Sequence, residues 1–228
     1  MEWRSADGVV WLEARLPGAT AAFSTRSAGD VKASHDRLAR ALGLDPGRVA
    51  SAHQVHGADL AFHRSPVARG GAEEQRSTGL PEVDGHVLFQ PGDAALVKVA
   101  DCLPVALAGS AGAAILHCGW RGLAAGIIAE GAAAVGATHA AIGPGIGPCC
   151  YEVGEEVLRA FAPLGGGIAA ERMLDLPEAA RRQLRAAGVE TVESAGLCTR
   201  CETERFFSHR RDGDPRRQAG VVWLDEAA

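Results

Sequence analysis

The sequence predicts an α+β fold of mixed β-sheets with helices packed on the outside. Two observations carry this prediction: strand-like apolar runs outnumber helical segments, and the two kinds of segment do not alternate regularly along the chain. Regular alternation would instead favour a doubly wound parallel sheet. No repeat or linker divides the chain, so we expect residues 1–228 to form a single domain.

Six apolar runs have the length and aliphatic character of strands. They cover residues 8–16, 19–25, 59–63, 93–100, 113–117 and 219–224. A polar segment rich in glycine and proline follows the third run, and we expect residues 64–82 to form a long surface loop rather than a linker. Strands on both sides of this loop can therefore contribute to one core.

Four segments have the composition and end signals of helices. The first lies between Ser34, a suitable N-terminal cap, and Gly43, a suitable stop. The second and third cover residues 122–136 and 155–162. The fourth covers residues 177–188, where a proline at the start and a glycine at the end follow the usual asymmetry of helix termini.

Charge and apolar content narrow the class of protein. The 28 acidic residues exceed the 23 lysines and arginines, which gives a net charge of -5 and no support for general nucleic-acid binding. No apolar stretch reaches the roughly 18 residues of a membrane span, and the N-terminus lacks the features of a signal peptide. We therefore expect a cytoplasmic protein without membrane partners, in which the six cysteines serve metal binding or catalysis rather than disulfides.

Potential metal donors gather in three short passages, two of which come directly after strand-like runs. The donors are His53 and His56 in "AHQVHGAD", Asp101 and Cys102 in "KVADCLPVAL", and His117 and Cys118 in "AAILHCGWRGLAAG". One thiolate and two imidazoles make a zinc triad whose fourth position is open to water, as in catalytic zinc sites. Spacing alone leaves open that the histidines are core residues bonded to backbone and that Cys102 is packing.

Six motifs together carry a resemblance to a known family. They are "HQVHG", "ADCLPV", "HCGWRGLAAGI", "IGPGIGPCCYEVGEEV", "GLCTRC" and "RFFSHRRDGDPRRQAGVVWL". In order and spacing they resemble the bacterial laccase-domain, or YfiH-like, family, also known as multicopper polyphenol oxidase or peptidoglycan editing factor, over about residues 23 to 224. The resemblance implies a mixed β-sandwich with outer helices, and a zinc ion held by His56, Cys102 and His117.

The chain departs from the family pattern at two places. After "FSTRSAGD" it passes almost directly to "VKASHDRLARALG", without the longer glycine-rich loop of the family, so we expect part of the pocket wall to be missing. The segment "VDGHVLF" adds His86 near the presumed site, where we expect its ring to face solvent.

Four arginines are candidates for holding an anion such as phosphate, because guanidinium binds oxyanions through paired hydrogen bonds. They are Arg26, Arg121, Arg210 and Arg211, and for each the alternative is a surface ion pair. Asp101, next to Cys102, is a candidate for orienting a ligand histidine. We predict catalytic roles for Cys102, Asp101 and Arg26.

Two further cysteine pairs stand outside the predicted triad. Cys198 and Cys201 form a C-x-x-C motif, and Cys149 and Cys150 are adjacent. A structural zinc site normally uses two chelating pairs, and adjacent cysteines chelate one ion poorly, so we interpret both pairs as packing motifs rather than as a second zinc site.

The resemblance implies purine nucleoside chemistry: phosphorolysis of inosine and adenosine, cleavage of methylthioadenosine, and deamination of adenosine, which zinc-activated water also performs in other deaminases. We predict a zinc-dependent purine nucleoside enzyme, monomeric or homodimeric, that takes a nucleoside and phosphate. A metal-free cysteine hydrolase acting on a peptidoglycan precursor through Cys102, and a non-catalytic binding protein, are the alternatives. Copper polyphenol oxidation is disfavoured because the eight histidines include no His-x-His pair and no axial methionine is evident.

Overall fold

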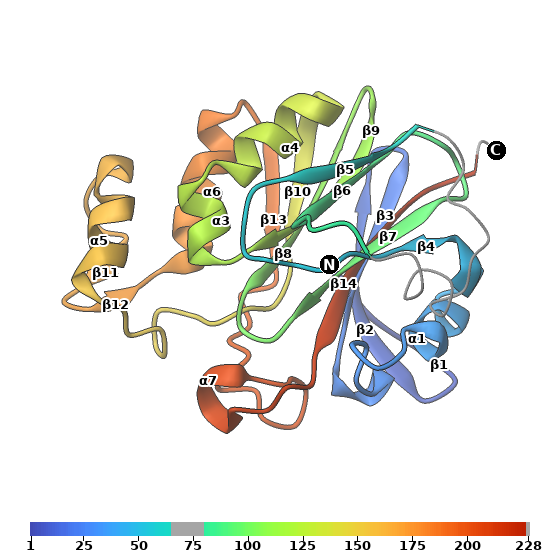
Figure 1. The fold of residues 1–228 in the computed structure, drawn as a ribbon, viewed down its shortest axis with the longest axis horizontal. Helices are drawn as coiled ribbons and strands as arrows, with labels where there is room; N and C mark the ends of the chain where they lie inside the picture. The colour runs from blue at the N-terminus through green and yellow to red at the C-terminus, as the bar shows by residue number, and fades with distance from the viewer. Residues whose placement is uncertain (65–79, 227–228) are drawn as a thin grey trace.

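Two six-stranded sheets form the body of the protein in a computed structural model, which describes residues 1–64 and 80–226 (Figure 1). The first sheet has the order β1 (Glu2–Ala6), β2 (Val9–Leu16), β3 (Ala19–Ser24), β14 (Gln218–Leu224), β7 (Ala94–Val99) and β4 (Val49–Ala50). The second has the order β13 (Thr191–Ser194), β10 (Ala137–Ile142), β8 (Leu103–Gly109), β9 (Gly112–Cys118), β6 (Gly85–Leu88) and β5 (Leu60–His63). A small third sheet pairs β11 (Ala169–Ala170) with β12 (Met173–Leu174).

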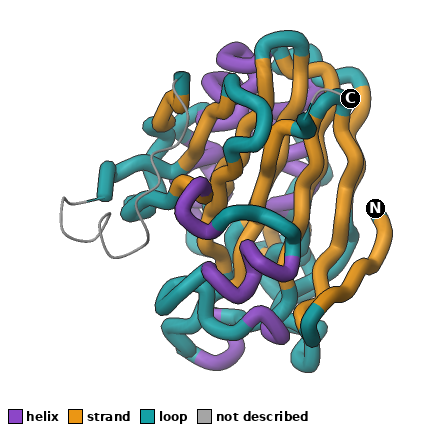
Figure 2. Tube along the Cα trace, turned by 90° about the vertical axis from the view of Figure 1, so that its right-hand side faces the viewer, coloured by secondary structure: helices purple, strands orange, loops and turns teal. Residues whose placement is uncertain are grey.

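Both large sheets are mixed. Most neighbours are antiparallel, but the pairs β4–β7, β5–β6 and β10–β13 are parallel. Figure 2 shows the N-terminal strand β1 at the free edge of its sheet. The predicted α+β class with mixed sheets is confirmed.

The sheets face one another across a shared apolar layer. Phe23 and Val97 of the first sheet lie in one buried cluster with Ala106, Ile115 and Ala141 of the second. Alanine is frequent in this layer, so small side chains let the two sheets approach closely. Because the sheets share this core, we keep the prediction of a single domain.

The helices pack on the outer faces, as the sequence predicts. The regular ones are α1 (Asp36–Ala41), α3 (Trp120–Ala124), α4 (Ile127–Val135), α5 (Glu155–Phe161), α6 (Leu176–Ala186) and α7 (His209–Asp212). Short 3-10 turns cover Arg26–Ala28, Pro46–Arg48 and Ala162–Leu164. Figure 1 shows α4 and α6 beside the second sheet and α1 beside the first, where Leu38 is buried against Leu96 and Val221.

The structure refines several predicted elements. The expected helix over residues 122–136 is two helices, because Gly126 adopts a left-handed conformation with φ of 90° and turns the chain between α3 and α4. The strand β8 escaped prediction, since its alanine- and proline-containing sequence has few β-branched residues. Most of the predicted surface loop, residues 65–79, lies outside the described residues. Within the described chain, no helix is both long and apolar enough to cross a bilayer.

Candidate metal centre and cavity

The three predicted ligands come together at one end of the second sheet. His117 lies near the end of β9, which pairs with β8 so that Cys102, the residue before β8, lies next to it. His56 belongs to the segment between β4 and β5 and has a left-handed backbone with φ of 62°. One donor atom from each of His56, Cys102 and His117 lies within 4.8 Å of the others. The other donors of these passages, His53, Asp101 and Cys118, stay outside the group.

Asp84, which sequence analysis did not single out, organises these ligands. Its buried carboxylate accepts a hydrogen bond of 2.7 Å from Nδ1 of His117. It also accepts bonds from the backbone N–H groups of Val55 (3.1 Å), His56 (3.0 Å) and Gly57 (2.7 Å). One carboxylate therefore fixes both the ring of His117 and the turn that carries His56. The feature that could have drawn attention to Asp84 is its position immediately before β6, the strand that pairs with β9.

Asp101 does not take the predicted part of orienting a ligand histidine. Its carboxylate accepts bonds of 2.7 Å from the hydroxyl of Thr199 and 2.7 Å from the backbone N–H of Arg210. It thereby ties the end of β7 to two segments near the C-terminus, and the orienting role belongs to Asp84.

The charges of the site keep Cys102 in its thiolate form, the form that binds metal. Burial alone would raise the pKa of the Cys102 thiol, but the imidazoles of His117 and His56 outweigh burial and lower it to about 6. Burial alone would lower the pKa of His117, but the Cys102 thiolate and the Asp84 carboxylate raise it to about 9. Without a metal, the pair is therefore a thiolate and an imidazolium at neutral pH.

The donor set fits a zinc ion. A thiolate and two imidazoles are typical zinc ligands, and because Nδ1 of His117 donates to Asp84, its Nε2 is left to bind the metal. Gly119 keeps the approach clear, since a Cβ atom there would lie 3.0 Å from Sγ of Cys102 and 3.3 Å from His56.

A cavity of about 420 Å³ opens beside these ligands, a volume within the usual range of small-molecule sites. Its wall includes the aromatic rings of Trp120 and Tyr151. Five cationic side chains also line it, namely Lys32, Lys98, Arg121, Arg210 and Arg217. Lys32 comes from the shortened segment after Arg26, so that segment still contributes to the wall.

The structure brings two of the four predicted arginines to this cavity. Arg121 and Arg210 line it, with their guanidinium groups over the rings of Trp120 (4.4 Å) and Tyr151 (5.1 Å). Among the described residues, Arg121 makes no ion pair. Within the same described part of the chain Arg210 makes none either, but its guanidinium donates to the carbonyl oxygen of Glu152 at 2.8 Å, so Arg121 is the better placed of the two to meet an anionic substrate.

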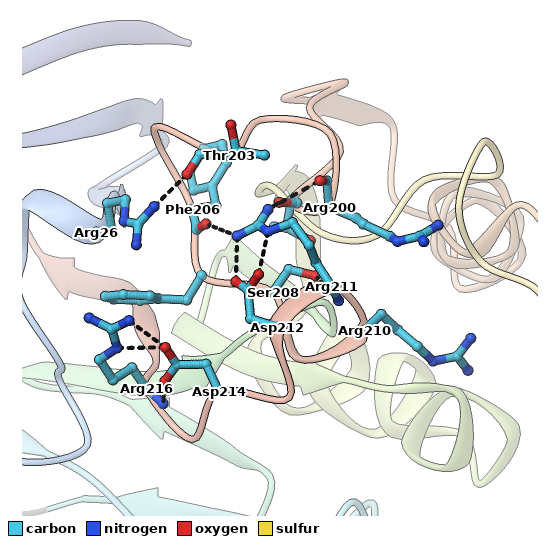
Figure 3. Close-up of polar contacts among 12 residues, drawn as sticks. Arg26, Arg200, Thr203, Phe206, Ser208, Arg210, Arg211, Asp212, Asp214 and Arg216 are labelled. Atoms are coloured by element: carbon cyan, nitrogen blue, oxygen red, sulfur yellow. Dashed lines mark hydrogen bonds and ion pairs between the residues drawn. The ribbon is translucent and has the colours of Figure 1, made fainter.

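Arg26 and Arg211 lie away from the cavity, contrary to their predicted role in substrate binding. Figure 3 shows Arg26 donating to the carbonyl oxygen of Thr203, at 2.6 Å. Arg211 pairs with Asp212 and donates to the carbonyl oxygens of Thr199, Arg200 and Phe206. Both side chains brace the loop before α7.

Comparison with known proteins decides the family. The family model described as multi-copper polyphenol oxidoreductase laccase matches residues 21–225. The chain belongs to this laccase family. Its relatives include a Streptomyces coelicolor protein named purine nucleoside phosphorylase SCO2081, which is 36% identical over 98% of this chain and 93% of its own length.

Solved structures of laccase-family relatives have the same fold. YlmD from Geobacillus stearothermophilus is 32% identical and superposes with a TM-score of 0.83 over 95% of this chain and 96% of its own. The Bacillus licheniformis protein YfiH is 27% identical, with a TM-score of 0.85 over 98% of this chain and 99% of its own. The predicted membership and fold are thus confirmed.

His86 occupies a different environment from the one expected for it in this laccase-family chain. Its ring is buried rather than facing solvent, because β6 lies between β9 and β5 inside the sheet. It hydrogen-bonds the ring of His63 at 3.1 Å, and burial, with the charges of His63 and Lys98, lowers the pKa of His86 to about 3. His86 is therefore neutral and paired, outside the donor group.

The lowered pKa of Cys102 leads to a test on metal-free protein. Because only the thiolate reacts, we expect chelator-treated protein to be alkylated at Cys102 by iodoacetamide at a nearly constant rate between pH 7 and 9. An ordinary thiol of pKa about 8.5 would react roughly 25-fold faster at the higher pH. Peptide mass spectrometry reads the rate at Cys102, with a free cysteine peptide as the reference. A rate that climbs like the reference would contradict the thiolate–imidazolium pair.

Proposed function

We propose that this chain is a zinc-dependent purine nucleoside phosphorylase. It would cleave the glycosidic bond of inosine, adenosine or methylthioadenosine with inorganic phosphate. One observation carries the proposal: the donor group His56, Cys102 and His117 borders the same cavity as Arg121 and Arg210, so a metal and an anion can meet one substrate. The relatives named purine nucleoside phosphorylase support this assignment.

Phosphorolysis requires phosphate to be held against the anomeric carbon of the ribose. Arg121 and Arg210 are suited to this task, because guanidinium groups bind phosphate through paired, charge-assisted hydrogen bonds. The pKa of Tyr151 is raised to about 12 by burial and by the Cys102 thiolate. Its hydroxyl therefore stays protonated and can donate a hydrogen bond to the purine or to phosphate, while Trp120 offers a flat surface to the base.

His56, Cys102 and His117 would hold the zinc ion, and Asp84 keeps His117 in the orientation that ligation needs. When bound, zinc supplies Lewis-acid polarisation of substrate atoms or activation of water. The second of these would also permit deamination of adenosine, which we include in the proposed activity. Copper is the less favoured metal, because no methionine is among the described residues that line the cavity.

A cysteine hydrolase is the second candidate, favoured by one observation. Cys102 and His117 form a thiolate–imidazolium pair, the arrangement that activates nucleophilic cysteines. Such an enzyme would act without metal, for example on a peptidoglycan precursor. The two candidates therefore differ in whether a chelator abolishes turnover.

The reaction itself tests the function. Full-length protein purified without added metal is incubated with inosine in the presence and absence of phosphate, and the products are separated by chromatography. We expect hypoxanthine and ribose 1-phosphate only when phosphate is present. Equal hypoxanthine release without phosphate would indicate hydrolysis, and no turnover of inosine, adenosine or methylthioadenosine would favour a binding protein.

The variant Arg121→Ala tests the anion site. We expect the KM for phosphate to rise roughly 10- to 100-fold, because a hydrogen bond to a charged group contributes about 1.5–3 kcal/mol. Zinc content should not change, since Arg121 is not among the donors. Arg159→Ala is the matched control, because Arg159 is exposed on α5 and outside the cavity. An unchanged phosphate KM in Arg121→Ala would remove this residue from the substrate site.

A further inference from the structure

Four cysteines outside the cavity gather from two loops that are distant in sequence. Cys149 and Cys150 follow β10, whereas Cys198 and Cys201 follow β13. These two strands are parallel neighbours, so both loops leave the same edge of the second sheet. A hydrogen bond of 3.0 Å from the backbone N–H of Thr199 to the carbonyl oxygen of Gly145 then joins the loops.

The sulfur atoms have the spacing of ligands around one ion. Sγ of Cys201 lies 3.6 Å from Sγ of Cys149 and 3.4 Å from Sγ of Cys150, and all four sulfurs lie within 4.8 Å of one another. Sulfurs bound to one tetrahedral zinc at about 2.3 Å are separated by about 3.8 Å, whereas a disulfide bond measures about 2.05 Å. The spacing therefore matches a shared metal better than a pair of disulfides.

The backbone around Cys198 is arranged for a thiolate ligand. The N–H of Gly147 donates to Sγ of Cys198 at 3.3 Å. The guanidinium of Arg211 interacts electrostatically with Cys198 and would offset part of the negative charge of a tetrathiolate site. N–H bonds to ligand sulfur and nearby cations are the usual support of metal-bound thiolates.

The fold removes the objection that adjacent cysteines chelate poorly. Residues 147–151 form a tight turn, in which the N–H groups of Cys150 and Tyr151 bond the carbonyl oxygen of Gly147 at 3.0 and 3.1 Å. The turn presents Cys149 and Cys150 to the opposite loop, where both approach Cys201. Cys198 and Cys201 provide the chelating C-x-x-C pair, so the four cysteines can share one ion.

We propose that Cys149, Cys150, Cys198 and Cys201 bind a second, structural zinc ion. Tetrathiolate coordination leaves no open position, so this ion holds structure rather than substrate. It would join the loop that supplies Tyr151 to the cavity wall with the loop whose Thr199 bonds Asp101. The inference is independent of the reaction that the cavity performs.

Metal stoichiometry separates the two sites. Full-length protein purified under reducing, anaerobic conditions should contain two zinc ions per chain by elemental analysis. We expect Cys149→Ser and Cys201→Ser to lose one ion each, and His117→Ala to lose the other. Cys118→Ala is the matched control and should keep both ions, because Cys118 is buried and belongs to neither donor group.

A spectroscopic measurement keeps the proposal testable if the serine variants fail to fold. Cobalt exchanged into His117→Ala should show the intense visible bands and sulfur charge-transfer absorption of tetrathiolate coordination. Cys149→His should keep the ion with shifted bands. A zinc content that Cys149→Ser and Cys201→Ser leave unchanged, no such cobalt spectrum, or an intact mass about 2 Da low that identifies a disulfide among these cysteines would overturn the proposal.

Discussion

Replacing Cys102 with serine is expected to remove the zinc ion proposed for the cavity and to reduce the proposed inosine phosphorolysis at least roughly 100-fold. Cys102 is the only anionic donor of its group, and its thiolate is held at neutral pH by His117 and His56. A serine hydroxyl remains protonated there and is a poor zinc ligand, so the metal and the activity should disappear together. Elemental analysis and product chromatography on the same preparation measure both losses.

The same residue separates the phosphorylase from the cysteine hydrolase. As a zinc ligand, Cys102 should resist iodoacetamide until a chelator is added, and the chelator should abolish turnover. As a nucleophile, it should be labelled rapidly in untreated protein, with activity lost in proportion and unaffected by chelator. If the Cys102→Ser variant kept the zinc ion bound with His117, Cys102 would not be a ligand.

In this experiment, labelling of Cys149, Cys150, Cys198 and Cys201 must be distinguished from labelling of Cys102. Their thiols also react with iodoacetamide, so labelling has to be assigned by peptide rather than by total thiol count. Cys118 serves as an internal reference, because it is fully buried and burial raises its pKa well above the usual value. Cys102→Ser should leave the second zinc in place if the two donor groups are independent.

Apolar patterning predicted mixed sheets with outer helices, because strand-like runs need only a buried face to be recognised. The runs over residues 93–100 and 113–117 correspond to β7 and β9, within a few residues at each end. Apolar patterning did not predict the residues whose role depends on tertiary contacts. The strand that follows Asp84 is not among the predicted runs, and only the pairing of β6 with β9 places Asp84 against His117.

The arginines show a second limit of the sequence. Arg26 and Arg211 have the same chemistry as Arg121, but loop carbonyl oxygens and Asp212 occupy their donors. Residue type cannot distinguish a guanidinium that braces a loop from one that faces a cavity. The cysteine pairs show the opposite error, in which residues that do come together were interpreted separately. Their convergence depends on the parallel register of β10 and β13, which no local motif encodes.

Replacing Asp84 with asparagine is expected to weaken zinc binding roughly 10- to 100-fold, the usual effect of losing a carboxylate that supports a ligand histidine. The carboxylate accepts bonds from His117 and from three consecutive backbone N–H groups. An amide has one acceptor oxygen, so at least one buried donor would face an NH2 group. Zinc affinity is measured by competition with a chromophoric chelator at pH 7.

The variant should also be less stable by about 3–5 kcal/mol, because removing one partner of a buried ion pair leaves the other uncompensated. Burial alone would raise the pKa of Asp84, but its bonds to His117 and to backbone N–H groups lower it. A lowered pKa means that the contribution is complete at neutral pH and is lost only as the pH falls into the acid range. Urea unfolding of metal-free protein at pH 7 therefore measures the full effect.

A matched variant separates loss of stability from loss of ligand orientation. Asp93 is also a fully buried carboxylate, paired with Arg48 at 2.6 Å, but it lies outside the donor group. Asp93→Asn should lower the free energy of unfolding while leaving zinc affinity and the pH profile of Cys102 alkylation unchanged. In metal-free Asp84→Asn, the pKa of His117 should fall and that of Cys102 should rise, because the imidazolium loses its carboxylate. Equal zinc affinities in the two variants would show that Asp84 only stabilises the fold.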